Sequence, residues 1–388
     1  MHNLVKECAI TFNDLVAARF DNYHLDFWAA FTVPAGKQNG YQNMIGNVPG
    51  MIFPAPNAVS GSTGLTSQIL NLPLPLFYGR DSGVALPTAA LPYNEMRINL
   101  NFRDWSDLLI QQVADDESIG TPVSAGDVGT ILSKAPTLSY VNVWANYAIV
   151  SNDERKRMAC APRDILIEQV QTAPRQTFDP KNNKNPSYDI RFSHAIKVLF
   201  FSVRNKTDYN EWSNYTTVSP VVKTTPNGPC VDFYNQHTAA DPIETTSLVY
   251  ENTARLSVMG SDYFSLVNPY FHAPVIPVQI GYHTYSYSLD FICLDPMGST
   301  NYGKLTNVSI GPNASAAAET AADTGGTSSQ TSQKYEFIVT AVNNNIIRIS
   351  GGALGQKGRP KIGRCFNSCG KTIRDKHLNY HQSAIYLC

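Results

Sequence analysis

Charged residues are scarce in this chain: Asp, Glu, Lys and Arg make up 16% of its 388 residues, against about 25% in a typical globular domain. The formal net charge is −1 at pH 7, so no overall charge attracts nucleic acid or an anionic membrane. Aromatic residues are abundant, at 11%. A surface poor in charge and rich in aromatic side chains is typical of a protein that packs against copies of itself, and also of an ordinary β-rich protein.

The chain also lacks long apolar runs and a regular cysteine pattern. The longest apolar candidate, around 196–201, is too short to span a bilayer, and the first residues lack the basic and apolar regions of a signal peptide. Seven cysteines at irregular spacing do not resemble a disulfide framework, which predicts synthesis in a reducing, cytosolic compartment. The sequons at Asn205, Asn214, Asn307 and Asn313 are then expected to be chance matches in surface loops.

Helical pattern is scarce as well, whereas short alternating segments between prolines and glycines predict the strands of sandwiches or barrels. The clearest helix signal is Ser151 followed by Glu154, which has capping-box spacing, with Pro162 closing the segment. We therefore expect a short, charged connector at 152–161 between two β-rich regions. The expected strands are 9–17, 96–102, 140–150, 165–171, 189–203, 283–292 and 335–342.

Two parts of the chain resemble each other faintly. Residues 10–25 and 248–266 share apolar, aromatic and acidic positions that end in Asp and Tyr before an aromatic helix, and 140–150 matches 335–342 as a closing strand. Either two β-to-helix corners look alike by chance, or the chain holds two tandem copies of one β-domain, which we favour. No strand-like segment precedes the first corner, so we expect the first copy to lack its opening strands and the chain to be N-terminally incomplete.

Two short matches suggest a competing function. Asp81 and Asp323 each begin an Asp-Ser/Thr-Gly motif that resembles the active-site turn of an aspartic protease, where two carboxylates share one proton. Such a turn requires a buried apolar strand behind it. Asp81 instead follows a glycine and an arginine, and Asp323 lies in the small-residue tract 311–333, which predicts a flexible loop. An aspartic-type hydrolase is therefore an alternative that we do not favour, and we expect no catalytic residues.

Several segments closely resemble the major capsid protein of iridoviruses, which are large nucleocytoplasmic DNA viruses, and look most like the invertebrate-infecting branch. The resemblance implies an all-β tandem double jelly roll, made of two antiparallel eight-stranded sandwiches. It also implies that three chains form a pseudo-hexagonal capsomer and that capsomers tile an icosahedral virus shell. The segments that carry it, in order along nearly the whole chain, are 1–15, 40–47, 72–109, 189–201, 247–256 and 295–310.

The resemblance and the connector together predict three regions. Residues 1–151 form the first jelly roll, incomplete at its N-terminus and sensitive to proteases, and residues 152–352 form the second, which could fold alone. Residues 353–388 diverge from the family in a basic tail, as a shifted reading frame would produce, and are expected to be disordered. The resemblance further implies assembly in the host cytoplasm, a place in the virion, and minor capsid proteins and the inner virion membrane layer as neighbours. Cofactors, small-molecule substrates and sequence-specific nucleic-acid binding are not expected.

The tail offers a second alternative, a zinc-dependent nucleic-acid binder. Cys365, Cys369, His377 and His381 are residue types that bind tetrahedral zinc, and the surrounding Lys and Arg residues could contact phosphates. The gap between the Cys and His pairs is shorter than the roughly twelve residues of a zinc finger, and few apolar residues could pack beneath a metal. We therefore expect no metal site. The histidines expected to be lone core or surface residues are His24, His194, His237, His272 and His283.

Overall fold

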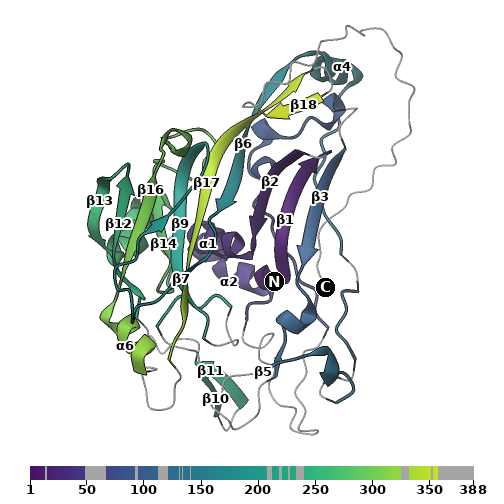
Figure 1. Ribbon diagram of the computed structural model, residues 1–388. Helices are drawn as coiled ribbons and strands as arrows, with labels where there is room; N and C mark the ends of the chain where they lie inside the picture. Colours follow the sequence, from purple (N-terminus) through teal and green to yellow (C-terminus); the bar gives the residue numbers. More distant parts are fainter. Residues whose placement is uncertain are drawn as a thin grey trace.

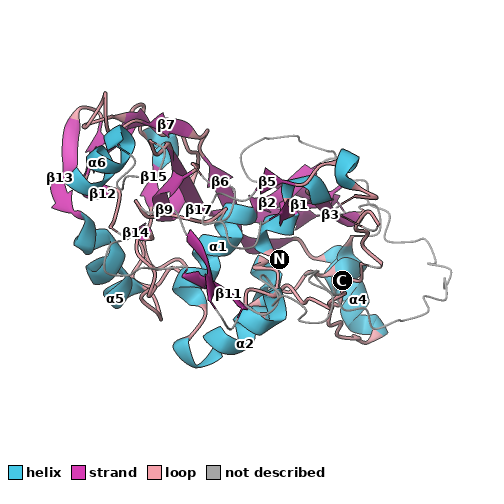
Figure 2. Cartoon of the chain, turned by 90° about the horizontal axis from the view of Figure 1, so that it is seen from below, coloured by secondary structure: helices cyan, strands magenta, loops and turns pink. Residues whose placement is uncertain are grey.

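Antiparallel strands form two β-rich halves that lie side by side, with few helices (Figures 1 and 2). The candidate zinc ligands Cys365, Cys369, His377 and His381 lie outside the described residues. The structure, a computed structural model, describes residues 1–13, 15–48, 67–91, 95–111, 121–130, 132, 134–139, 141–207, 212–217, 221–225, 228–232, 240–324, 332–350 and 353–356.

The second half is a sandwich of two antiparallel sheets. One sheet has the strand order β13-β12-β16-β8, and the other is built on the long strand β17, which pairs with β6, β7, β9 and β18, while β14 and β15 pair with β9. Leu199, Phe201 and Phe337 are among the side chains that fill the space between the sheets. The strands are β6 (Arg163–Thr172), β7 (Gln176–Phe178), β8 (Tyr188–Asp189), β9 (Ala195–Asn205), β12 (Ile243–Tyr250), β13 (Thr253–Gly260), β14 (His283–Ser286), β15 (Thr300–Asn301), β16 (Val308–Ala314), β17 (Tyr335–Ser350) and β18 (Ala353–Gln356).

The first half contains a three-stranded sheet with the order β2-β1-β3. The segment 9–17, expected as one strand, turns in the middle: Asn13 has a φ of 53°, a left-handed conformation that asparagine tolerates and that tight hairpin turns use. The expected strand 96–102 is confirmed as β3. The elements of this half are β1 (Val5–Phe12), β2 (Leu15–Asp21), α1 (Asn22–Thr32), α2 (Ala35–Ile45), β3 (Met96–Phe102), β4 (Ile110–Gln111) and β5 (Thr121–Pro122).

The connector helix α4 (Asn152–Cys160) links the two halves. The backbone N–H of Glu154 donates to Ser151 Oγ at 3.3 Å, which confirms the predicted cap. Further helices are α5 (Asn268–His272) and α6 (Ala316–Thr324), and β10 (Val221–Thr225) pairs with β11 (Gly228–Asp232). Short turns of 3-10 helix are η1 (His2–Leu4), η2 (Phe77–Gly79), η3 (Ser82–Val84), η4 (Thr88–Ala90), η5 (Trp105–Asp107), η6 (Ala125–Asp127) and η8 (Tyr302–Lys304), and η7 (Tyr263–Val267) is a π-helical turn.

The predicted duplication is visible in the topology. Each half contains a β-hairpin that leads into a helical segment: β1 and β2 lead into α1, and β12 and β13 lead into η7 and α5. The first strand of each hairpin also pairs on its other side with a later strand, β3 in one half and β16 in the other. The second hairpin turns at Glu251 and Asn252, whose φ angles of 47° and 65° match the left-handed Asn13. The segments 10–25 and 248–266 therefore occupy equivalent places.

The two halves share a hydrophobic core. Ile10 and Phe20 of the first sheet lie in one buried cluster with Ile167 of β6 and Ile347 of β17. This is feasible because β6 and the far half of β17 continue alongside the first sheet, where β18 also lies (Figure 1). A chain division at residue 151 therefore separates strands whose side chains fill one core.

Three expectations are wrong. Residues 141–150 form no β-strand. The residues matched to them, 335–342, do form part of a strand, β17, which has a partner strand on each side. The tract 311–333 begins with β16 and continues as α6, because its alanines favour helix and can be buried. The sequon residues Asn205 and Asn214 are buried rather than on surface loops. By contrast, the strands expected at 165–171 and 335–342 are confirmed, 189–203 is confirmed as β8 and β9, and 283–292 is a strand only as far as Ser286.

A cavity in the shared core should destabilise both halves together. Ile347→Ala, at a position 1% exposed, is expected to lower the free energy of unfolding by about 2–5 kcal/mol. It should also speed protease cleavage within residues 1–151, since their core loses a wall. Urea unfolding and limited proteolysis measure both effects. Ile69→Ala, at a position 62% exposed, is the control and should change stability by less than about 0.5 kcal/mol. Normal cleavage of the first half in Ile347→Ala would contradict the shared core.

Candidate functional site

The two aspartates of the protease-like motifs have separate structural roles. Asp81 caps η3, where its Oδ1 accepts from the backbone N–H of Gly83 at 2.8 Å. Asp323 lies on α6, where its Oδ1 is 2.5 Å from Nζ of Lys181. Each carboxylate is occupied by residues of its own neighbourhood, so the paired geometry that a shared proton requires is not formed. The expectation of a flexible loop at Asp323 was wrong, but the resulting helix builds no protease turn.

A second polar cluster has the residue types of a hydrolase but not the arrangement. His283 Nε2 lies 2.7 Å from Asp241 Oδ2 and 2.9 Å from Ser261 Oγ. A Ser-His-Asp triad places the acid and the nucleophile on opposite nitrogens of the ring. Both contact Nε2 here, while Nδ1 is buried without a hydrogen-bond partner and the ring stacks on Phe201. His283 is therefore a packed core histidine, as expected from the sequence.

The described residues hold no group of three or more His, Cys, Asp or Glu side chains placed to bind a metal ion. Within the same ranges, no helix has both the length and the apolar character needed to cross a bilayer.

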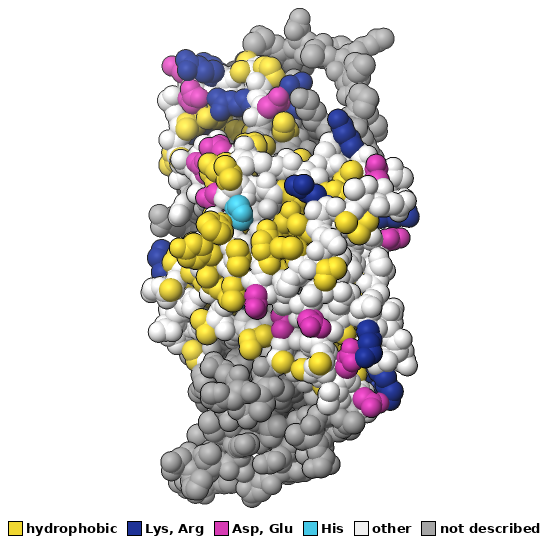
Figure 3. All heavy atoms as spheres, turned by 90° about the vertical axis from the view of Figure 1, so that its left-hand side faces the viewer, with side chains coloured by type: hydrophobic (Ala, Val, Ile, Leu, Met, Phe, Trp, Pro, Cys, Tyr) yellow, Lys and Arg dark blue, Asp and Glu magenta, His cyan; other side chains and the backbone are white. Residues whose placement is uncertain are grey.

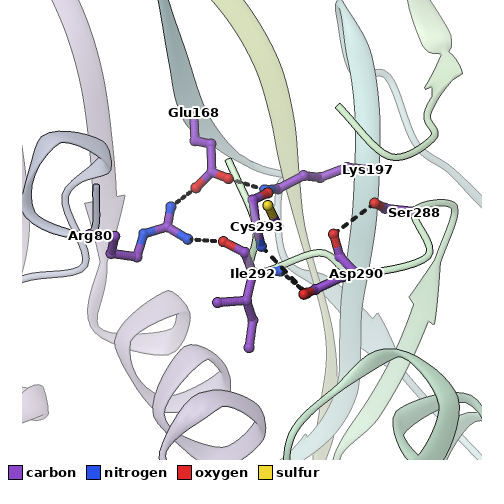
Figure 4. Close-up of polar contacts among 7 residues, drawn as sticks. All are labelled: Arg80, Glu168, Lys197, Ser288, Asp290, Ile292 and Cys293. Carbon is purple, nitrogen blue, oxygen red and sulfur yellow. Dashed lines mark hydrogen bonds and ion pairs between the residues drawn. The ribbon is translucent and has the colours of Figure 1, made fainter. Parts of the chain in front are cut away.

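The most unusual polar constellation lies at the junction of the two halves. The carboxylate of Glu168, on β6, forms ion pairs with Arg80 from the first half and Lys197 from β9 (Figure 4). The side chains of Glu168 and Lys197 are only 6% and 2% exposed. Buried charges are tolerated when they are paired and hydrogen-bonded, which these are.

A β-bulge brings Lys197 into this junction. Val342 of β17 pairs with Val198, but the next residue of β17, Asn343, pairs with Ile196, so Lys197 is the extra residue in β9. A bulge can turn a side chain out of the regular alternation. Lys197 Nζ then reaches Glu168 and also donates to the carbonyl oxygen of Cys293 at 3.2 Å.

Arg80 contributes the contact across the halves. Its Nη1 donates to the carbonyl oxygen of Ile292 at 2.8 Å, and its guanidinium lies 4.8 Å from the ring centroid of Trp28. Burial lowers the pKa of Arg80 to about 10, so the side chain remains charged at neutral pH. The loop that supplies Ile292 is itself held by Asp290, whose Oδ1 accepts from the Ile292 backbone N–H at 2.8 Å (Figure 4). Glu168 is thus the shared anion of a polar junction that fixes one half against the other.

Comparison with known proteins identifies the family. A family model for the large eukaryotic DNA virus major capsid protein matches residues 154–355, and one for the major capsid protein N-terminus matches residues 1–150. The chain is 64% identical over 359 residues to the major capsid protein of Costelytra zealandica iridescent virus, with 92% of this chain and 76% of that protein aligned. The chain belongs to the major capsid proteins of iridoviruses. Identity to the major capsid protein of Lymphocystis disease virus 1 (isolate Darai) is 49% over 357 residues, covering 91% of this chain and 75% of that protein.

Solved capsid structures share the fold. A chain of the PBCV-1 virus capsid superposes with a TM-score of 0.66 at 18% identity, covering 92% of this chain and 84% of that one. The Faustovirus major capsid protein gives a TM-score of 0.57 at 14% identity, covering 90% and 72%. The double jelly roll expected from the resemblance is therefore confirmed, and the chain is a capsid protein of a large DNA virus.

Among the residues that the structure describes, exposed apolar side chains gather in at least two stretches of this capsid protein. The first, called here the α5 surface, lies on the outer face of the second half, where hydrophobic side chains gather (Figure 3). The second, the 141–149 strip, lies in the segment that leads into α4. Exposed apolar patches of this kind mark interaction sites. The α5 surface comprises Leu266, Val267, Tyr270, Phe271, Val278 and Leu289, and the 141–149 strip comprises Val141, Trp144, Tyr147 and Ile149.

The polar junction was not predicted from the sequence, although signals for it exist. Glu168 interrupts the apolar segment 165–171, and Lys197 interrupts the apolar run around 196–201. A single charge within a buried strand requires a partner of opposite sign, because such residues are almost never fully buried unpaired. The two could have been proposed as a pair on that ground, whereas Arg80 stands in a loop with no comparable signal.

Removing the charge of Glu168 should destabilise the folded chain. Glu168→Gln leaves Arg80 and Lys197 buried without their counter-charge, and we expect the free energy of unfolding to fall by about 3–5 kcal/mol in urea titrations. Glu95→Gln is the matched control, since Glu95 forms an exposed pair with Arg97 and the unfolding midpoint should hardly move. Equal effects of the two substitutions would contradict the role assigned to Glu168.

Stability should also depend on His24, which is buried beside the junction. Burial, with the nearby charge of Arg80, lowers the pKa of His24 to about 3. Between about pH 6.5, the pKa of histidine in the unfolded chain, and pH 3, His24 is therefore protonated in the unfolded chain but not in the folded chain. The contribution of neutral His24 to the free energy of unfolding is complete above about pH 6.5. It is lost as the pH falls toward 3, by up to about 1.4 kcal/mol per pH unit.

His24→Leu removes this term, so its urea midpoint should fall less than the wild-type midpoint between pH 7 and pH 4.5. His194→Asn is the control because the His194 side chain is exposed, and asparagine tolerates its φ of 66°. Parallel pH profiles for His24→Leu and wild type would contradict the lowered pKa, because the folded chain would then bind this proton as readily as the unfolded chain.

Proposed function

We propose that three copies of this chain associate into a pseudo-hexagonal capsomer and that these capsomers tile an icosahedral virus shell. The observation that carries the proposal is the duplicated architecture, in which two halves with the same hairpin and helix order lie side by side in one chain. Three chains with two similar halves each offer six similar walls, which suits a hexagonal array.

The surface supports the same proposal. The α5 surface and the 141–149 strip expose aromatic and aliphatic side chains on a chain that is only 16% charged. Interface cores are depleted in charge and enriched in aromatic residues. The contacts of Asp81, Asp323 and His283 favour structural roles for these residues, and so a structural protein over a hydrolase.

The proposal extends to the finer partners that the resemblance implies. In this proposal, minor capsid proteins and the inner virion membrane layer are neighbours of the assembled shell, and synthesis and assembly take place in the host cytoplasm. The division into jelly rolls at 1–151 and 152–352, with a separate tail at 353–388, is part of the same proposal, as is the absence of a metal site at Cys365, Cys369, His377 and His381.

The trimer should form without a shell. Multi-angle light scattering of the purified chain at micromolar concentration is expected to give the mass of three chains. Because the exposed apolar surfaces carry little charge, the trimer should persist in 1 M NaCl, where the Debye length falls to about 3 Å. A stable monomer at micromolar concentration would contradict the proposal, and dissociation by salt alone would show that charge rather than apolar contact holds the chains together.

A further inference from the structure

Two buried nitrogen atoms beside the polar junction have no hydrogen-bond partner in the described part of the chain. Arg80 uses Nη1 for the carbonyl oxygen of Ile292 and Nη2 for the carboxylate of Glu168 (Figure 4), but its Nε has no partner. His24, on α1, is 2% exposed, and its Nδ1 has no partner either. Buried polar atoms are almost always hydrogen-bonded, so both nitrogens require an explanation.

The surroundings of His24 determine what its ring can do. The imidazole lies among aromatic rings, with centroids 5.9 Å from Phe20, 5.7 Å from Trp28 and 6.5 Å from Phe200. Burial lowers the pKa of His24 to about 3, so the ring is neutral at pH 7. A neutral imidazole has one N–H and one acceptor nitrogen, whereas the guanidinium of Arg80 can only donate. Nδ1 of His24 can therefore serve as an acceptor, and Nε of Arg80 requires one.

A small cavity is lined by both residues. Its volume is about 20 Å³, and its walls also include Glu168, Ala18 and several apolar side chains. A buried water molecule needs roughly 10–15 Å³ of such space and two to four polar partners. The cavity therefore has room for one water molecule, and its walls carry both a donor and acceptors.

We propose that this cavity holds one structural water molecule, which accepts a hydrogen bond from Arg80 Nε and donates one to His24 Nδ1. Its second O–H can donate to the carboxylate of Glu168, which has lone pairs beyond those that Arg80 and Lys197 use. An anion in the cavity would lie against Glu168, and a cation would lie against Arg80. An apolar occupant would leave both nitrogens unpaired. Water satisfies the site because it donates and accepts.

This water joins α1 to the loop that carries Arg80. The three nitrogens of a guanidinium lie in one plane, so a partner for Nε also orients Nη1 and Nη2. Those two nitrogens contact Ile292 and Glu168 of the second half. The water site belongs to the single chain and is independent of the proposed trimer.

Nuclear magnetic resonance of the full chain tests the site, with protonated histidine in a deuterated background and water itself as the probe. The His24 side chain is too buried to touch bulk solvent. A nuclear Overhauser effect between water and the Cε1 proton of His24, which is next to Nδ1, is therefore expected only from a bound water molecule. The signal is assigned by its loss in His24→Leu. A wild-type chain without this signal overturns the proposal.

Filling the cavity tests the location of the water. Ala18 is 9% exposed and lines the cavity, so the two methyl groups added by Ala18→Val should expel the water and abolish the signal. Ala85→Val adds the same groups at an exposed position and should leave the signal unchanged. A signal that persists in Ala18→Val is relayed by exchange of the ring's own N–H, and it overturns the assignment to this cavity.

A crystal structure of the wild-type chain decides the question if Ala18→Val does not fold. One water peak about 2.7–3.2 Å from both His24 Nδ1 and Arg80 Nε would support the site. Absence of that peak from a map in which other buried waters are visible would overturn it.

Discussion

Strand β9 is buried on both faces, and the packing of the whole chain depends on how each face is covered. Leu199 and Phe201 point into the sandwich of the second half, whereas Val198 and Phe200 point the other way and lie under α1. Leaving the second face in water would forgo about 25 cal/mol for each Å² of apolar area. Because α1 follows β2 directly in the chain, covering this face also brings the first sheet against the long ends of β6 and β17.

The same strand supplies the polar junction. The bulge in β9 takes Lys197 out of the apolar alternation and toward Glu168, and Arg80 completes the pairing from the first half. Apolar packing alone is tolerant of small shifts, whereas paired buried charges lose much of their stabilisation when one partner moves away. The aromatic contact under α1 therefore supplies attraction, and the junction at Glu168 restricts the angle between the halves.

The sequence correctly predicted the features that depend on residues close together in the chain. The cap at Ser151 and the strand 96–102 rest on neighbouring residues, and both are confirmed. The segment 140–150 has the alternation of a strand, but a strand also needs a ladder partner, and alternation does not show whether one is present. The polar junction was missed for a similar reason. Lys197 meets Glu168 because of a one-residue bulge, and Arg80 arrives through the packing of a distant segment, so both depend on tertiary structure.

The few charges of this chain and its exposed apolar surfaces have complementary uses in the proposed assembly. Contacts between apolar surfaces are attractive but weakly directional, and they yield a closed ring only when every chain presents its surfaces at one fixed angle. That angle is set inside the chain, because the α5 surface belongs to one half and the 141–149 strip to the other. A looser junction at Glu168 would let the angle vary and favour open, irregular chains of subunits. The buried ion pairs therefore matter for assembly through the rigidity of the subunit, while the contact between subunits can remain uncharged.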